Sequence, residues 1–125
     1  SYTGALDLNY REFARIYEFV NNVGDRHKHN CYLVMVTMNT LPEQLADIEK
    51  IEKALDCMEQ SIRSKIRKVD VCTRYSSMQY LIILFEPQEN QIPNVMERIF
   101  MHYYELCDRE DFKPQYEYIK MTEPK

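Results

Sequence analysis

The stretch RKVDVCTRYSSMQYLIILF, residues 67–85, carries the pattern that decides the predicted fold. Residues 71–75 and 78–85 are rich in β-branched, aromatic and aliphatic side chains, which is typical of two short strands. Ser76 and Ser77 stand between these strands, where we expect a hairpin turn. Two-residue hairpin turns usually need positive φ, which favours Gly, Asn or Asp, so a pair of serines is unusual there.

Two longer elements precede the hairpin. Residues 31–38, CYLVMVTM, form a continuous apolar run that predicts a strand buried in the centre of a sheet. Residues 41–66 carry apolar side chains every three or four positions, with charges on the opposite side, and predict a long helix. Thr40 and Glu43 have the spacing of a capping box, so we expect this helix to start directly after Thr40. The apolar positions assigned to its buried face are Leu45, Ile48, Leu55, Met58 and Ile62.

The remaining segments complete the order of elements. Helical patterns cover residues 9–23 and 93–107, and residues 115–121 alternate as an edge or half-buried strand. The whole order is one helix followed by β-α-β-β-α-β. We therefore predict an α+β fold with a ferredoxin-like βαββαβ core, in which helices cover one face of an antiparallel sheet, and an additional N-terminal helix.

Composition limits the classes of function. The chain has 125 residues, of which 45% are hydrophobic, and this suffices for one domain with a single core. Its net charge of −4 argues against a general nucleic-acid or membrane binder. No apolar run approaches the length of a membrane span. Because the sequence starts at Ser1 without a Met, we expect residues 1–125 to be a single cytoplasmic domain excised from a longer multidomain protein.

The spacing of the cysteines and histidines predicts no metal site. The four cysteines are widely spaced within apolar segments, unlike zinc or redox sites, and are expected to be buried reduced thiols. His27 and His29 form an H-x-H without a third ligand nearby, and we interpret them as surface residues. The cysteines are Cys31, Cys57, Cys72 and Cys107.

In this order of elements, residues 67–85 resemble the GGDEF domains of diguanylate cyclases, which make cyclic di-GMP from two GTP. Those domains read R-x-x-D-x-x-x-R-Y-G-G-D/E-E-F before an apolar strand, and SSMQY, residues 76–80, occupies the signature here. The opening GALDLNYREF, residues 4–13, is similar to the family's D-x-L-T-G-L-x-N-R-x-x-F motif. The matching positions are Arg67, Asp70, Arg74 and Tyr75 at the hairpin, and Asn9, Arg11 and Phe13 at the opening.

The resemblance implies that the family's catalytic groups are absent. Cyclisation needs divalent metals held by carboxylates, which activate the 3′-hydroxyl and neutralise the triphosphate. Met78 stands at a metal-binding carboxylate, Gln79 at the Glu that helps to bind guanine, and Thr37 and Asn39 at a D-x-D-like pair. We therefore expect no diguanylate cyclase activity and no cofactor. The residues of the degenerate signature are Ser76, Ser77, Met78, Gln79 and Tyr80.

The resemblance also implies a ligand site that does not depend on catalysis. In active cyclases the R-x-x-D pair, with an Arg on the following helix, binds the product cyclic di-GMP, and the matching residues are Arg67, Asp70 and Arg98. A guanidinium can bond the O6/N7 edge of guanine, and a carboxylate can accept from its N1 and N2 donors. The alternative is a surface ion pair between Arg67 and Asp70, worth a few tenths of a kcal/mol, beside an ordinary exposed Arg98.

Three functional hypotheses follow. The first is a catalytically inactive GGDEF-like regulatory module of a bacterial signalling protein, with cyclic di-GMP reception as its sharpest form. The second is a residual diguanylate cyclase or nucleotide-hydrolysing enzyme, and the third is a pure dimerisation scaffold. The expected partners are cyclic di-GMP, flanking sensor or output domains of the same chain and a second copy in a homodimer. Neither nucleic acid nor direct membrane contact is expected.

Overall fold

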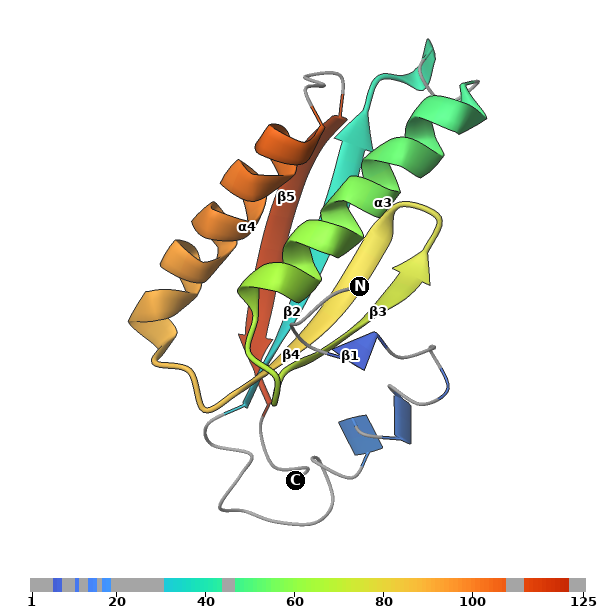
Figure 1. The fold of residues 1–125 in the computed structure, drawn as a ribbon. Helices are drawn as coiled ribbons and strands as arrows, with labels where there is room; N and C mark the ends of the chain where they lie inside the picture. The colour runs from blue at the N-terminus through green and yellow to red at the C-terminus, as the bar shows by residue number, and fades with distance from the viewer. Residues whose placement is uncertain are drawn as a thin grey trace.

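A computed structural model describes residues 6–7, 11, 14–15, 17–18, 31–43, 47–107 and 112–121. Figure 1 shows a single sheet with two long helices, α3 and α4, lying side by side across one face. The strands stand in the order β1-β3-β4-β2-β5. The elements are β1 (Leu6–Asp7), β2 (Cys31–Thr40), α3 (Ile48–Lys65), β3 (Val71–Ser76), β4 (Gln79–Phe85), the 3₁₀-helix η2 (Glu89–Gln91), α4 (Ile92–Leu106) and β5 (Phe112–Lys120).

The strands β2 to β5 and the helices α3 and α4 form the predicted βαββαβ core. Strand β4 pairs antiparallel with both β2 and β3, and β5 pairs antiparallel with β2. The two-residue strand β1 was not predicted. It pairs parallel with β3 through Leu6 and Val71, and so covers that edge of the sheet.

Apolar residues pack on both faces of the sheet. Val34, Val36 and Met38 of β2 belong to the main core between the sheet and the helices. On the opposite face, Cys31 belongs to a second buried cluster, against which Leu33 and Met35 pack. Strand β2 is therefore buried from both sides, which explains why its sequence is continuously apolar instead of alternating.

The predicted N-terminal helix is described only in part. Residues 11, 14–15 and 17–18 are helical, and Tyr17 packs against the second cluster on the face opposite α3 and α4. The other residues assigned to this helix, together with His27 and His29, lie outside the described residues.

The predicted start of the long helix was wrong. Strand β2 continues through Thr40, which pairs with Phe112 of β5, so Thr40 does not cap a helix. Helix α3 begins instead at Ile48, and the side chain of Asp47 caps it by accepting a hydrogen bond of 3.1 Å from the backbone N–H of Lys50. Ile48 is 67% exposed and does not belong to the buried face.

The cysteine prediction is confirmed, since all four thiols are free and buried. In the part of the chain that the structure describes, no helix is long and apolar enough to cross a membrane.

Removing the hydroxyl group of Tyr80 should destabilise the fold. Tyr80 is buried and donates a hydrogen bond of 2.9 Å to the backbone carbonyl of Leu55 in α3, which ties β4 to that helix. We expect Tyr80→Phe to lower the free energy of unfolding by about 1 kcal/mol in urea denaturation. Tyr104→Phe, at a ring that is 41% exposed, is the matched control and should change it by less than about 0.5 kcal/mol. Equal losses in the two variants would contradict this assignment.

Candidate functional site

The hairpin between β3 and β4 turns one residue later than predicted. Ser76 is still part of β3 and pairs with Gln79, so the turn consists of Ser77 and Met78. A register shift between Arg74 and Ser76 interrupts the ladder before the turn. Such a bulge increases the local twist of a hairpin. None of the turn residues has positive φ, so the serines occupy ordinary backbone conformations.

Side chains hold this turn closed. The Nε and Nη2 atoms of Arg74 donate to the backbone carbonyls of Ser76 and Ser77, each at 3.2 Å. The Ser76 hydroxyl donates to Oε1 of Gln79 at 2.9 Å and accepts from the backbone N–H of Met78 at 3.3 Å. The side chains of Arg74 and Ser76 thus bond within the hairpin itself.

Gln79 joins the hairpin to β2 through neutral groups. Its Nε2 donates to Oγ1 of Thr37 and to Sδ of Met35, both at 3.2 Å. Met78 is half-buried, its side chain packs against the main core, and its carbonyl accepts from the backbone N–H of Met38 at 2.8 Å. Among the described residues, no group of three His, Cys, Asp or Glu side chains could hold a metal ion.

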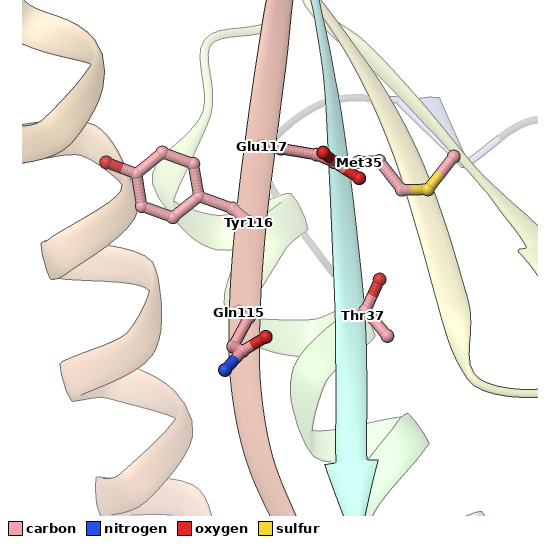
Figure 2. Close-up of a pocket in the computed structure, with 5 residues that line it drawn as sticks. All are labelled: Met35, Thr37, Gln115, Tyr116 and Glu117. Carbon is pink, nitrogen blue, oxygen red and sulfur yellow. The ribbon is translucent and has the colours of Figure 1, made fainter.

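A small cavity of about 210 Å³ lies beside this network, on the sheet face opposite α3 and α4. Figure 2 shows Met35 and Thr37 of β2 and Glu117 of β5 at this cavity, whereas the ring of Tyr116 extends toward α4. Gln115 completes the lining. Glu117 is the one carboxylate among the five lining residues, so the cavity presents mainly neutral polar and thioether groups.

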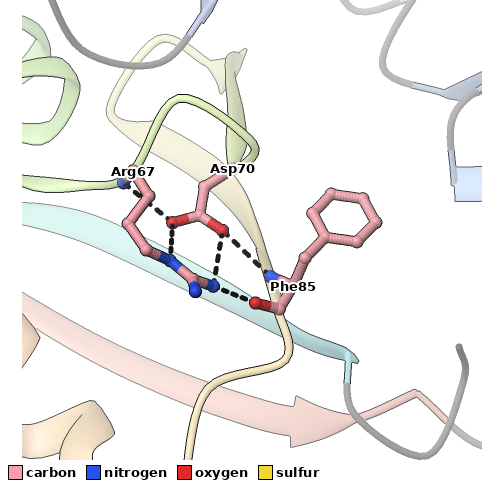
Figure 3. A network of polar contacts seen from close by, with 3 residues as sticks. All are labelled: Arg67, Asp70 and Phe85. Carbon is pink, nitrogen blue, oxygen red and sulfur yellow. Dashed lines mark hydrogen bonds and ion pairs between the residues drawn. The ribbon is translucent and has the colours of Figure 1, made fainter.

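Arg67 and Asp70 form a closed network with the end of β4 (Figure 3). Oδ2 of Asp70 accepts from the backbone N–H of Arg67 at 2.9 Å and from its Nε at 3.4 Å. Oδ1 accepts from Nη2 of Arg67 at 3.3 Å and from the backbone N–H of Phe85 at 3.0 Å. Nη2 of Arg67 also donates to the backbone carbonyl of Phe85. Asp70 thus accepts four hydrogen bonds. It does so in a buried position, since the residue is only 2% exposed.

This arrangement differs from the surface ion pair that the sequence offered as the alternative. The two partners lie in unequal environments, because the Arg67 side chain is 56% exposed while Asp70 is buried. Phe85 was missed by sequence reasoning, since its contribution is made by backbone atoms fifteen positions away. No side-chain motif could have indicated it.

A cavity of about 340 Å³ adjoins this network and is lined by Cys31, Arg67, Val69, Phe85 and Glu86. Burial raises the pKa of the Cys31 thiol, a hydrogen bond with the backbone of Glu86 lowers it, and the nearby carboxylates of Glu86 and Asp70 raise it further. The lining of this cavity thus includes one cationic side chain, Arg67, and one anionic side chain, Glu86.

The structure does not join Arg98 to this pair. Arg98 is exposed on α4 and makes no hydrogen bond or ion pair with any residue that the structure describes. The carbonyl of the next residue, Ile99, accepts from the Ser61 hydroxyl where α4 crosses α3. Arg67 follows the C-terminal end of α3 at Lys65. A ligand that contacts all three predicted residues would have to span from this turn to the exposed face of α4.

The fold is shared with solved structures of cyclase-related proteins. A DGC protein from Thermotoga maritima superposes with a TM-score of 0.68 at 17% identity, over 91% of this chain and 81% of that one. The FimX GGDEF domain from Pseudomonas aeruginosa gives 0.70 at 13% identity, over 94% and 76%. Diguanylate cyclase SiaD from Pseudomonas aeruginosa, solved in complex with its activator SiaC, gives 0.67 at 19% identity, over 88% and 45%.

No known family profile and no curated protein sequence matches this chain. At identities of 13 to 19%, the structural likeness establishes the fold. The chain therefore has the fold of GGDEF domains, as its resemblance at residues 67–85 implied.

Asp70 should contribute more to stability than its partner Arg67. Asp70→Ala leaves the backbone N–H groups of Arg67 and Phe85 without their buried acceptor, and we expect a loss of about 3 kcal/mol in the free energy of unfolding. Arg67→Ala leaves the carboxylate with both backbone donors. Because the Arg67 side chain is 56% exposed, water can replace it beside the carboxylate, and this variant should cost clearly less. Urea denaturation of the two variants measures the difference, and a cost for Arg67→Ala equal to that of Asp70→Ala would contradict the assignment.

Proposed function

We propose that this chain is a catalytically inactive regulatory module with a GGDEF fold, and that cyclic di-GMP is its candidate ligand. The observation that carries the first part is the neutral network of Gln79, Thr37 and Met35. Thr37 belongs to the pair that the resemblance expects to be metal-binding carboxylates, and Gln79 stands where it expects the Glu that helps to bind guanine. A regulatory module acts by binding a ligand or other domains, so it can keep the GGDEF fold without catalysing cyclisation.

The loss of metal ligands is expected to abolish cyclisation rather than to slow it slightly. Divalent metals supply several kcal/mol of charge stabilisation to a transferring phosphoryl group. A thioether at Met78 and an amide at Gln79 are poor ligands for Mg²⁺, which prefers carboxylate oxygens. The amide of Gln79 is in addition already bonded to Thr37 and Met35, so it would have to leave two partners to meet a nucleotide.

The assay for this proposal is incubation with GTP and Mg²⁺ followed by chromatographic separation of the nucleotides. We expect no cyclic di-GMP, and no GDP beyond the amount formed without protein. An active diguanylate cyclase under identical conditions is the positive control, and ATP in place of GTP tests for general nucleotide hydrolysis. Robust turnover of either nucleotide would favour the alternative of a residual enzyme and would overturn the proposal.

The candidate ligand rests on Arg67, whose guanidinium lies at the wall of the 340 Å³ cavity and is 56% exposed. Its Nη1 makes no hydrogen bond with a described residue, so this group is available to a guanine or phosphate oxygen. Asp70 is fully engaged by four donors. Binding through the carboxylate as well would require Arg67 to move away from it and from the Phe85 carbonyl.

Calorimetric titration with cyclic di-GMP tests this part separately. We expect measurable heat at tens of micromolar protein, and a loss of affinity of roughly 10- to 100-fold in Arg67→Ala, because charge-assisted hydrogen bonds are removed. Lys68→Ala, at the neighbouring exposed cation, is the matched control and should retain binding. Absence of heat, or unchanged affinity in Arg67→Ala, would remove the receptor part. Concentration-dependent self-association that cyclic di-GMP leaves unchanged would then favour a dimerisation scaffold.

A further inference from the structure

The two edges of the sheet differ. The strand order β1-β3-β4-β2-β5 places β1 at one edge and β5 at the other (Figure 1). The short strand β1 covers β3 by parallel pairing through Leu6 and Val71. Strand β5 runs over nine residues, Phe112–Lys120, and β2 is its only partner among the described residues. In the part of the chain that the structure describes, β5 therefore forms a long open edge.

The hydrogen bonds between β2 and β5 show which backbone groups of β5 face outward. The backbone N–H of Met121 donates to the carbonyl of Cys31 at 2.9 Å, and these two residues continue the register of the two strands. Hydrogen-bonded and non-hydrogen-bonded pairs alternate in an antiparallel ladder. The odd-numbered residues of β5 therefore bond to β2, and the even-numbered residues point their backbone groups outward. The outward residues are Phe112, Pro114, Tyr116, Tyr118 and Lys120.

Two observations agree with this orientation. The backbone N–H of Met38 donates to the carbonyl of Met78, so the even-numbered residues of β2 bond to β4 and the odd-numbered ones to β5. Pro114 has no N–H, and an outward position on an edge strand is where proline costs the ladder no hydrogen bond. The outward N–H and C=O groups have no partner within the described residues. An extended segment can therefore add to this edge through backbone hydrogen bonds.

The exposed side chains of β5 match a second copy of the same strand. Lys113 and Glu117 stand at equal distances from Gln115 along the strand, and all three are exposed. They share the sheet face opposite α3 and α4, because side chains alternate along a strand. Lysine alone on an edge strand disfavours further pairing. Here an antiparallel copy with Gln115 opposite Gln115 sets each Lys113 directly opposite Glu117 of the partner subunit.

We propose that β5 is a homodimer interface, through which two copies of this chain join their sheets antiparallel with the two-fold axis at Gln115. The outward backbone groups of Phe112 then face those of Tyr118 of the partner subunit. Those of Pro114 face Tyr116 of the partner subunit, where only the missing N–H of Pro114 leaves a hydrogen bond unmade. The open edges of the two copies thus close each other.

Other two-fold registers satisfy the charges less well. An axis at Tyr116 moves Lys113 and Glu117 of the partner subunit from directly opposite to diagonal positions, where their attraction is weaker. An axis at Glu117 sets two carboxylates directly opposite each other, which is destabilising. The register with Gln115 at the axis is therefore the one that the charges favour.

Aromatic rings lie along the same edge on the face that α4 covers. The ring of Tyr116 packs edge-on against Phe100 of α4, with centroids 5.9 Å apart, and stacks with Tyr118 at 6.4 Å. Both tyrosines are only half-buried. In the dimer, Pro114 of one copy lies opposite Tyr116 of the other and covers part of this ring surface. The inference does not rest on the proposed function, because the Arg67 network does not contribute to this edge.

Sedimentation equilibrium of the 125-residue chain tests the dimer, at about 1 to 500 μM, a range that covers weak interfaces. We expect a reversible dimer. Lys113→Glu and Glu117→Lys each set like charges opposite each other, twice by symmetry, and should weaken it roughly ten-fold. The double variant Lys113→Glu/Glu117→Lys restores both pairs and should regain the original dissociation constant. Lys120→Glu, with the same change in net charge outside the paired residues, is the matched control and should leave it unchanged.

A cysteine at the axis tests the register. Residues opposite each other in a non-hydrogen-bonded pair have Cα atoms about 4.5 Å apart, which permits a disulfide. Gln115→Cys should therefore give a covalent dimer under mild oxidation, whereas Ile119→Cys, at a residue that is 61% exposed on the same face, should not. The native cysteines described are buried and do not compete.

Three results would overturn the proposal. The first is a monomer at every concentration, which would leave this edge to a segment of a different protein. The second is a dimer that neither charge reversal weakens. The third is cross-linking of Ile119→Cys without cross-linking of Gln115→Cys, which would show a different register. Failure to bind cyclic di-GMP affects none of these readings, so the dimer and the proposed ligand are tested separately.

Discussion

The structure depends on the burial of β2 between two neighbouring strands and two apolar layers. Its inward residues Val34, Val36 and Met38 meet α3 and α4, and its outward residues pack against the second cluster. Both neighbours, β4 and β5, pair with it along most of its length. A slip by one residue would turn Val34, Val36 and Met38 away from α3 and α4 and bring the half-buried set Leu33, Met35 and Thr37 against the helices. In the observed register β2 pairs with β4 from Cys31 opposite Phe85 to Thr37 opposite Gln79, and this pairing places the hairpin.

That register explains the character of the candidate site. It sets Thr37 opposite Gln79, so the residues of the hairpin and of β2 face each other on the same side of the sheet. The approach of the two strands brings an amide, a hydroxyl and a thioether into contact. These three side chains cross-link the hairpin to β2 within a backbone that has the fold of GGDEF domains.

The Arg67 and Asp70 pair joins a buried carboxylate to a half-exposed guanidinium. The buried carboxylate receives two backbone N–H groups, one from its own turn and one from the end of β4, and so fastens the turn after α3 to the sheet. The guanidinium closes the network from the solvent side. The two residues of one short motif thus lie in different environments, because Asp70 is buried and the Arg67 side chain is 56% exposed.

The sequence by itself determined the element types of the core, the βαββαβ order and the burial of the cysteines. These features follow from local periodicity and residue chemistry. Only the tertiary structure decided where α3 begins, because pairing of Thr40 with Phe112 prolongs β2, and where the hairpin turns, because a bulge shifts the ladder before Ser76. It also decided that the carboxylate of Asp70 meets the backbone N–H of Phe85. Such contacts join residues that are distant in the chain, and their energies depend on packing that no local pattern encodes.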